Sequence, residues 1–150
     1  MADTPDYPDC NPVLFIDARR RLWLVWITIL NHRWEGSLLK TALALRTGEW
    51  LLIGNDTEQG RHQLAVWLSD DEGRTWRIAR HLERDAEGRG RYAYPCAIQA
   101  RDGTIHVTYS YALERDDLPR DEQGRPKRSA IKWARFDREW LLQGDSSGIL

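Results

Sequence analysis

The chain lacks several features that mark particular protein classes. It has 2 cysteines in 150 residues, too few for the disulfide framework of a small secreted protein. Its longest apolar run, residues 22–30, has 9 residues, whereas a membrane helix needs about 18. The first residues are acidic and contain no apolar stretch, which argues against a signal peptide. We therefore expect a cytoplasmic protein without a membrane segment.

Neither sign of charge dominates, because 22 Lys and Arg stand against 23 Asp and Glu. Such a balance gives no electrostatic attraction for nucleic acid or for an anionic membrane. The 4 histidines are far apart and have no cysteine partners at ligand spacing, so we predict no metal site and no cofactor. Cys10 and Cys96 could pair only if the fold brought them together, and we expect both to be reduced.

What the chain has in excess is tryptophan, with 8 Trp beside 5 Tyr and 2 Phe. Broad rings suit pleated surfaces in a core, and they also suit sugar-binding faces. Short apolar or alternating runs between polar turns predict strands, and no helical period persists over ten positions. The predicted strands cover residues 13–16, 22–29, 36–45 (as two short strands), 50–54, 63–68, 76–82, 97–100, 105–111 and 131–136. The sequence therefore predicts an all-β fold.

We expect one domain over residues 1–150, with flexible tails at 1–9 and 142–150. Between the last two predicted strands, residues 112–129 form a loop in which 10 of 18 residues are charged. A segment of this composition cannot build a core. It is either a recognition loop or a solvated extension of a hairpin.

Three segments share the pattern of apolar run, short turn and apolar run: residues 13–26, 43–53 and 97–109. Gly48 and Gly103 occupy the same place in their turns and lie 55 positions apart, close to the length of a four-stranded propeller blade. Arg20 precedes Gly48 by only 28 positions, about half a blade. The spacing indicates that part of one repeat is missing.

The strongest motif is S-x-D-x-G-x-T-W, which is complete here as Ser69, Asp71, Gly73, Thr75 and Trp76. The carboxylate can accept hydrogen bonds from turn N–H groups. The glycine permits a positive φ, and the tryptophan can pack across the base of the hairpin. We expect the role of this motif to be structural rather than catalytic.

This motif is the Asp-box, and the chain resembles the bacterial BNR-repeat sialidase (neuraminidase-like) family. Residues 11–15 and 21–24 are similar to an early blade of that family. Its last two blades are similar to residues 51–56, 60–61, 69–76, 94–95, 98–109 and 131–132. The family forms a six-bladed propeller more than twice this length. The resemblance thus implies about three four-stranded blades, with the middle blades absent and the join near residues 40–45.

A sialidase-type site binds the substrate carboxylate through arginines and uses a tyrosine nucleophile with an acidic general acid/base. The resemblance implies that Arg61 and Asn55 bind substrate and that Asp56, Tyr94 and Tyr109 are catalytic. Other interpretations stay open: a surface ion pair for Arg61, an Asx turn for Asp56 and core packing for both tyrosines. Further arginines could come from Arg33 and Arg115, although their spacing does not single them out.

The expected function is a sialidase-like glycoside hydrolase that removes a terminal, acidic sugar, with a homodimer as one way of completing the ring. The alternatives are a non-catalytic carbohydrate-binding module or inactive remnant, and a fragment of an interrupted gene. For the hydrolase and for the binding module, the expected partner is a carbohydrate. Neither nucleic acid nor membrane is expected to bind.

Overall fold

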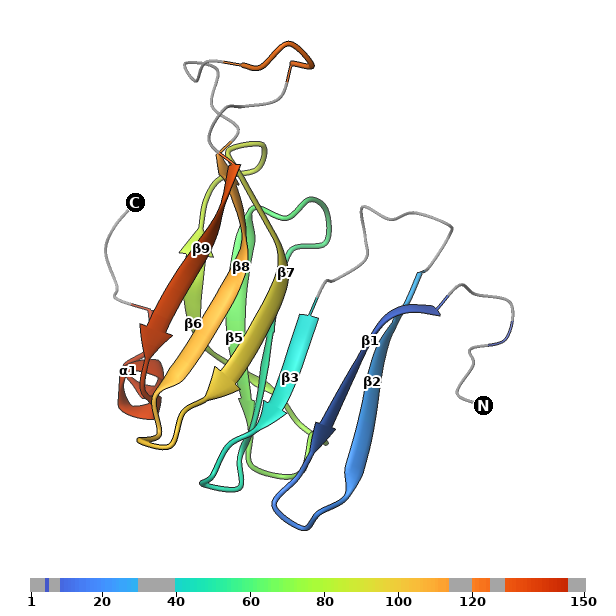
Figure 1. Ribbon diagram of the computed structural model, residues 1–150, viewed down its shortest axis with the longest axis vertical. Coiled ribbons are helices and arrows are strands. Elements are labelled where there is room, and N and C mark those ends of the chain that lie inside the picture. The colour runs from blue at the N-terminus through green and yellow to red at the C-terminus, as the bar shows by residue number, and fades with distance from the viewer. Residues whose placement is uncertain (1–4, 6–8, 30–39, 114–119, 125–128, 146–150) are drawn as a thin grey trace.

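The computed structural model describes residues 5, 9–29, 40–113, 120–124 and 129–145, and these residues form three antiparallel sheets and one short helix (Figure 1). Sheet A pairs β1 (Asp9–Ile16) with β2 (Leu22–Thr28). Sheet B is formed by β3 (Lys40–Ala44), β4 (Trp50–Gly54), β5 (Gln63–Ser69) and β6 (Arg77–Arg84). Sheet C is formed by β7 (Gly90–Gln99), β8 (Ile105–Leu113) and β9 (Ser129–Phe136). The all-β prediction is confirmed, although only sheet B has four strands among the described residues.

Most predicted strands agree with the structure to within two residues, but two begin much earlier. β1 starts at Asp9 and β7 at Gly90, whereas the sequence predicted these strands from residues 13 and 97. Both strands contain a proline and an irregular register, which hides them from a test of simple alternation. The 112–129 loop is narrower than predicted, because β8 continues to Leu113.

The sequence also failed to predict α1 (Arg138–Leu142), which overlaps the expected C-terminal tail. Asp137 caps this helix by accepting a hydrogen bond from the Trp140 backbone N–H at 2.7 Å. A capped helix of five residues is too short to produce a helical period. No helix in the described part of the chain is long and apolar enough to cross a membrane.

The first hairpin of each sheet closes with the same turn. Asp17, Leu45 and Ala100 each donate a backbone N–H to the residue four positions later, at 2.8–3.0 Å. The backbone carbonyl of each of these three residues accepts a hydrogen bond from the backbone N–H three positions later, at 2.9–3.1 Å. At that fourth turn position the backbone has a positive φ in all three sheets: 63° at Arg20, 92° at Gly48 and 91° at Gly103. The predicted internal repeat is therefore present as a repeated hairpin.

Sheets A and C share a second landmark. The register of β1 shifts between Cys10 and Val13, and that of β7 shifts between Ala93 and Cys96. These bulges lie 83 positions apart, as do the first residues of the two turns. The two hairpins are thus equivalent residue by residue along their first strands.

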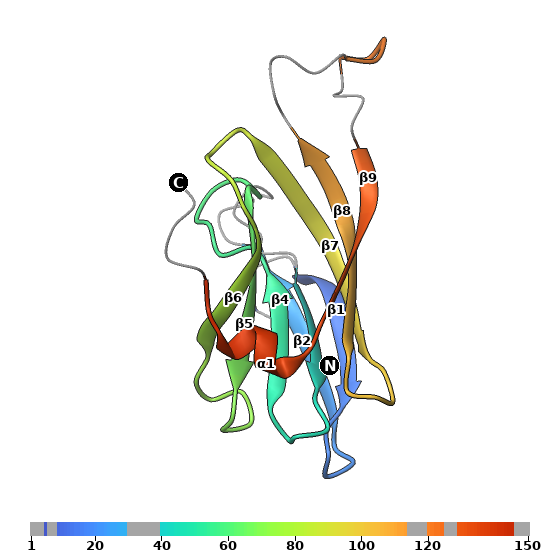
Figure 2. The same cartoon turned by 90° about the vertical axis from the view of Figure 1, so that its left-hand side faces the viewer.

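Sheet B lies between the other two sheets. Its first strand β3 contacts β1 on one side and β7 on the other, and Figure 1 shows these three strands side by side. The larger core fills the space between sheets B and C, which Figure 2 shows as separate layers with α1 at their lower end. A smaller core joins sheets A and B, where the Trp50 ring meets the edges of Phe15 and Trp23 at centroid distances of 5.1 and 4.7 Å.

Candidate functional site

The Asp-box forms the turn between β5 and β6, and its side chains make the hydrogen bonds that the motif predicts. Ser69 donates its hydroxyl to Asp71 Oδ1 at 2.8 Å and accepts from the Gly73 backbone N–H at 2.8 Å. Asp71 also accepts from the Thr75 backbone N–H at 2.9 Å and from the Thr75 hydroxyl at 2.6 Å. The carboxylate therefore closes the loop from inside.

These donors determine the charge state of the turn. The hydrogen bonds from the Thr75 hydroxyl and backbone, followed by that from Ser69, lower the pKa of Asp71 from 3.8 to about 2. A carboxyl group held this firmly as an anion is a poor proton donor at neutral pH. The geometry supports a structural role for Asp71.

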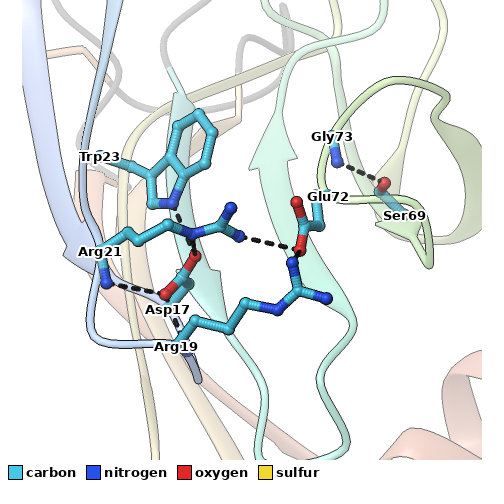
Figure 3. A network of polar contacts seen from close by, with 7 residues as sticks. All are labelled: Asp17, Arg19, Arg21, Trp23, Ser69, Glu72 and Gly73. Atoms are coloured by element: carbon cyan, nitrogen blue, oxygen red, sulfur yellow. Dashed lines mark hydrogen bonds and ion pairs between the residues drawn. The ribbon is translucent and has the colours of Figure 1, made fainter.

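A network of ion pairs joins the Asp-box to the first turn of sheet A (Figure 3). Glu72 accepts from the guanidinium groups of Arg19 and Arg21, each at 2.8 Å. Arg21 also donates to Asp17 at 2.6 Å, and the Trp23 indole N–H donates to the same carboxylate at 2.9 Å. Burial alone would raise the pKa of Asp17, but the hydrogen bonds from Trp23 and Arg21 outweigh it and lower the pKa to about 2. The network connects sheets A and B, and no motif in the sequence predicted it.

A surface pocket of about 560 Å³ lies at the other end of the strands, near the start of β7. It is lined by Arg61, Arg91, Ala93, Tyr94, Ser110, Tyr111, Ala112, Ser129, Ala130 and Ile131. Since β5 runs from the Arg61 side to the Asp-box, the pocket and the motif occupy opposite ends of the sheets. Two of the predicted site residues, Arg61 and Tyr94, meet in this pocket.

Two cations enter the pocket from different sheets. Arg61 precedes β5 in sheet B, and Arg91 is the second residue of β7 in sheet C. Neither guanidinium forms an ion pair with another residue in the described ranges. The surface ion pair considered for Arg61 is therefore not seen. Arg91 was missed because the sequence predicted no strand between residues 82 and 97, where β7 begins at Gly90.

Tyr94 is 64% exposed and has a φ of 53° in the bulge of β7. A positive φ is uncommon for a residue with a side chain and costs on the order of 1–3 kcal/mol. The bulge places two consecutive residues opposite one position of β8, which changes the direction of the side chain relative to the regular pleat. Tyr94 therefore reaches the pocket instead of packing in the core.

Asn55 and Asp56 do not line the pocket. Asn55 is buried, and its amide nitrogen donates to the backbone carbonyls of Gln63 at 2.7 Å and Tyr92 at 3.0 Å. These bonds hold the β4–β5 connection against β7. Asn55 thus positions the segment that carries Arg61 without touching the pocket itself.

Asp56 instead faces His81 on β6, with 2.7 Å between its Oδ2 and the ring Nε2. The other ring nitrogen, Nδ1, lies 2.5 Å from Asp145 Oδ2. The His81 ring thus bridges the carboxylates of Asp56 and Asp145. The contact attaches the residues after α1 to sheet B and lies outside the pocket.

Tyr109, the third residue predicted to be catalytic, lies in the core between sheets B and C and is 2% exposed. Its hydroxyl donates to the carboxylate of Glu83, which also accepts from the Lys132 ammonium group. Burial, followed by the hydrogen bond to Glu83, raises the pKa of Tyr109. The phenol is held neutral and does not reach the pocket.

Four further residues were candidates in the sequence: Arg33, Arg115, Cys10 and Cys96. Arg33 and Arg115 lie outside the described residues. Cys10 and Cys96 are both free. In the described ranges no group of three or more His, Cys, Asp or Glu side chains could hold a metal ion.

Residues 40–107 match the family model of the BNR repeat-like domain. The matched segment contains all of sheet B, the Asp-box and the first hairpin of sheet C up to Val107. This finding confirms the BNR repeat that the Asp-box predicted. No curated protein matches the chain, and no solved structure matches it.

Proposed function

We propose that the pocket binds a carbohydrate that carries a carboxylate. The observation that carries this proposal is the meeting in one pocket of two arginines, Arg61 and Arg91, that form no ion pair with any described residue. A guanidinium group matches a carboxylate through two parallel hydrogen bonds. Tyr94 and Tyr111 add aromatic surface on which the apolar face of a sugar ring can pack. BNR-like repeats occur in sialidases and other glycoside hydrolases, which supports a sugar ligand.

The three sheets are proposed to be consecutive blades of a propeller. The support is the repeated first hairpin in each sheet and the side-by-side arrangement of β1, β3 and β7. In such an arrangement the loops at one end of the blades converge on a shared binding surface. Arg61 and Arg91 both lie at that end, on neighbouring sheets.

Hydrolysis of the bound sugar is a second candidate. Tyr109 beside Glu83 has the form of a nucleophile paired with a base. Its burial separates it from the pocket, however, and among the described residues no carboxylate lines the pocket. Binding without hydrolysis is therefore the function that the geometry favours.

The test is calorimetric titration with N-acetylneuraminic acid and glucuronic acid, with galactose as the neutral comparison. We expect the acids to bind and galactose to bind at least tenfold more weakly. Arg61→Gln and Arg91→Gln should each weaken acid binding by about tenfold or more, because a charge-assisted hydrogen bond contributes about 1.5–3 kcal/mol.

Arg74→Gln is the matched control, because Arg74 is an exposed arginine in the Asp-box turn, far from the pocket. It should leave acid binding unchanged. Equal affinity for the acids and galactose, or an equal loss in all three variants, would contradict the proposal. Release of a fluorophore from a fluorogenic sialoside by the wild-type chain would instead favour hydrolysis.

A further inference from the structure

Sheet A presents an apolar face that no other described element covers. Leu14, Ile16 and Leu22 are 63%, 64% and 66% exposed. They lie on one side of the sheet with Leu24, because Ile16 pairs with Leu22 and Leu14 pairs with Leu24. The opposite side of the sheet carries Phe15 and packs on sheet B. A contiguous exposed patch of this kind marks an interaction surface.

Sheet C has a second open face at the other end of the row of sheets. Ile98, Ile131 and Trp133 are 63%, 71% and 59% exposed. His106 lies on the same face and stacks on Trp133, with 5.7 Å between the ring centroids. The opposite side of sheet C carries Ile105 and Val107 and forms the core with sheet B.

The repeated turn allows positions on the open face of sheet A to be matched with positions in sheets B and C. Counting from the first residue of each turn, Leu22 of sheet A corresponds to Trp50 of sheet B and Ile105 of sheet C. Trp50 packs on the sheet before it, and so does Ile105. Leu22 and Leu24 therefore occupy packing positions, but the described residues provide no preceding sheet for them to pack on.

The face of sheet C is equivalent to the other half of the same contact. Ile98 corresponds to Phe15, and His106 corresponds to Trp23. Phe15 and Trp23 are the residues that receive Trp50 of the following sheet. The two open faces are thus the two halves of an interface that already occurs twice within the chain.

We propose that two copies of the chain associate head to tail, with sheet C of each copy packed on sheet A of the other. The repeat predicts that Leu22 of the partner subunit packs against Ile98 and His106. One chain cannot pack these two faces on each other, because sheet B lies between sheet A and sheet C. A second copy supplies both missing halves in matching register, and the resulting pair leaves neither face open.

The association also bears on the pocket. Ile131 and Ser110 belong to the open side of sheet C and line the pocket. A second copy seated on that face would add a wall to it. The interface itself rests only on the two faces, so it stands or falls independently of any ligand.

Light scattering on a sizing column tests the association without ligand. The expected mass is twice 17.5 kDa. Leu22→Arg and Trp133→Arg should each shift the mass towards one chain, because each places a charge in both copies of the contact. Leu142→Arg is the matched control, since Leu142 is an exposed apolar residue on α1 outside both faces. It should remain a dimer.

Mixing provides a readout that a folding defect cannot imitate. A mixture of Leu22→Arg with Trp133→Arg chains retains one intact contact and should recover a dimer, which neither variant forms alone. In a Cys10→Ser, Cys96→Ser background, Leu22→Cys with Ile98→Cys should give a disulfide between chains. A wild-type monomer, an open-ended polymer, dimeric charge variants or no disulfide between chains would each overturn the proposal.

Discussion

Gly73→Ala tests whether the Asp-box is locked by its contact with the smaller core. Gly73 has a φ of 79°. A Cβ atom at this position would lie 2.9 Å from two ring carbons of Trp50. The Trp50 ring is buried between Phe15 and Trp23 and cannot easily move away. The substitution should therefore incur two separate costs, one from the backbone and one from the steric contact.

The two costs can be estimated separately. A residue with a Cβ in the left-handed region costs about 1–2 kcal/mol. Forcing a methyl group into a packed site costs about 1–3 kcal/mol. Gly73→Ala should thus lower the free energy of unfolding by about 2–5 kcal/mol, a large part of the stability of a domain of this size.

Gly103→Ala isolates the backbone cost. Gly103 has a φ of 91°, and nothing lies within 4 Å of the place where its Cβ would be. Urea unfolding followed by tryptophan fluorescence and circular dichroism, at one protein concentration, should show a loss of about 1–2 kcal/mol for this variant. Combining Gly73→Ala with Trp50→Leu should remove most of the difference between the two glycines.

Equal losses for Gly73→Ala and Gly103→Ala would refute the reasoning, because they would show that the Trp50 ring yields without cost. The same conclusion would follow if Trp50→Leu left the effect of Gly73→Ala unchanged. In either case the glycine of the motif would be required only for its backbone conformation.

Two further predictions concern charged groups. The pKa values of Asp17 and Asp71 are lowered to about 2 in the folded chain. Their stabilisation is therefore complete above the unfolded pKa near 3.8 and is lost as the pH falls through about 2. Thermal unfolding at pH 5, 3.5 and 2.5 should show a Tm that falls with pH. Asp71→Asn should lower the Tm at pH 5 and reduce the decrease in Tm between pH 5 and pH 2.5. A Tm independent of pH would contradict this prediction. Arg138→Gln should lower the free energy of unfolding by about 0.5–1 kcal/mol, because Arg138 donates to both oxygens of Glu49 and joins α1 to the β3–β4 turn. The control is Glu139→Gln, which changes the same helix and leaves this ion pair intact. Equal losses for the two variants would contradict the role of the pair.

The fold was predictable from the sequence where local rules and tertiary packing agree. β4 begins and ends where the apolar run predicts, because both of its faces pack against neighbouring sheets. β7 was not predictable over its first half, because Pro95 and the bulge interrupt the alternation. Neighbouring strands impose the extended conformation there, and their positions are not encoded in the local sequence.

The site was predictable only in part, because the local sequence does not encode which neighbour a polar side chain meets in the fold. Arg61 follows a strand end and Tyr94 precedes a proline, so both are conspicuous in the sequence, and both reach the pocket. Asn55 is equally conspicuous, yet its amide serves the backbone of β7. A polar residue at a strand end can face the solvent or satisfy a buried carbonyl, and local sequence does not distinguish these outcomes.

The open faces illustrate the limit most clearly. Leu22 and Trp50 occupy equivalent positions in the repeat, and the apolar runs that contain them predict a core position for both. Trp50 is buried, whereas Leu22 is exposed, because among the described residues a preceding sheet packs on Trp50 and none packs on Leu22. The sequence pattern thus predicts which sheet faces are suited to packing, and the structure shows which of these faces no described sheet covers. Among the described residues sheet A lacks a preceding sheet and sheet C lacks a following one, although the chain carries both halves of the contact. This mismatch is what supports the proposed second copy.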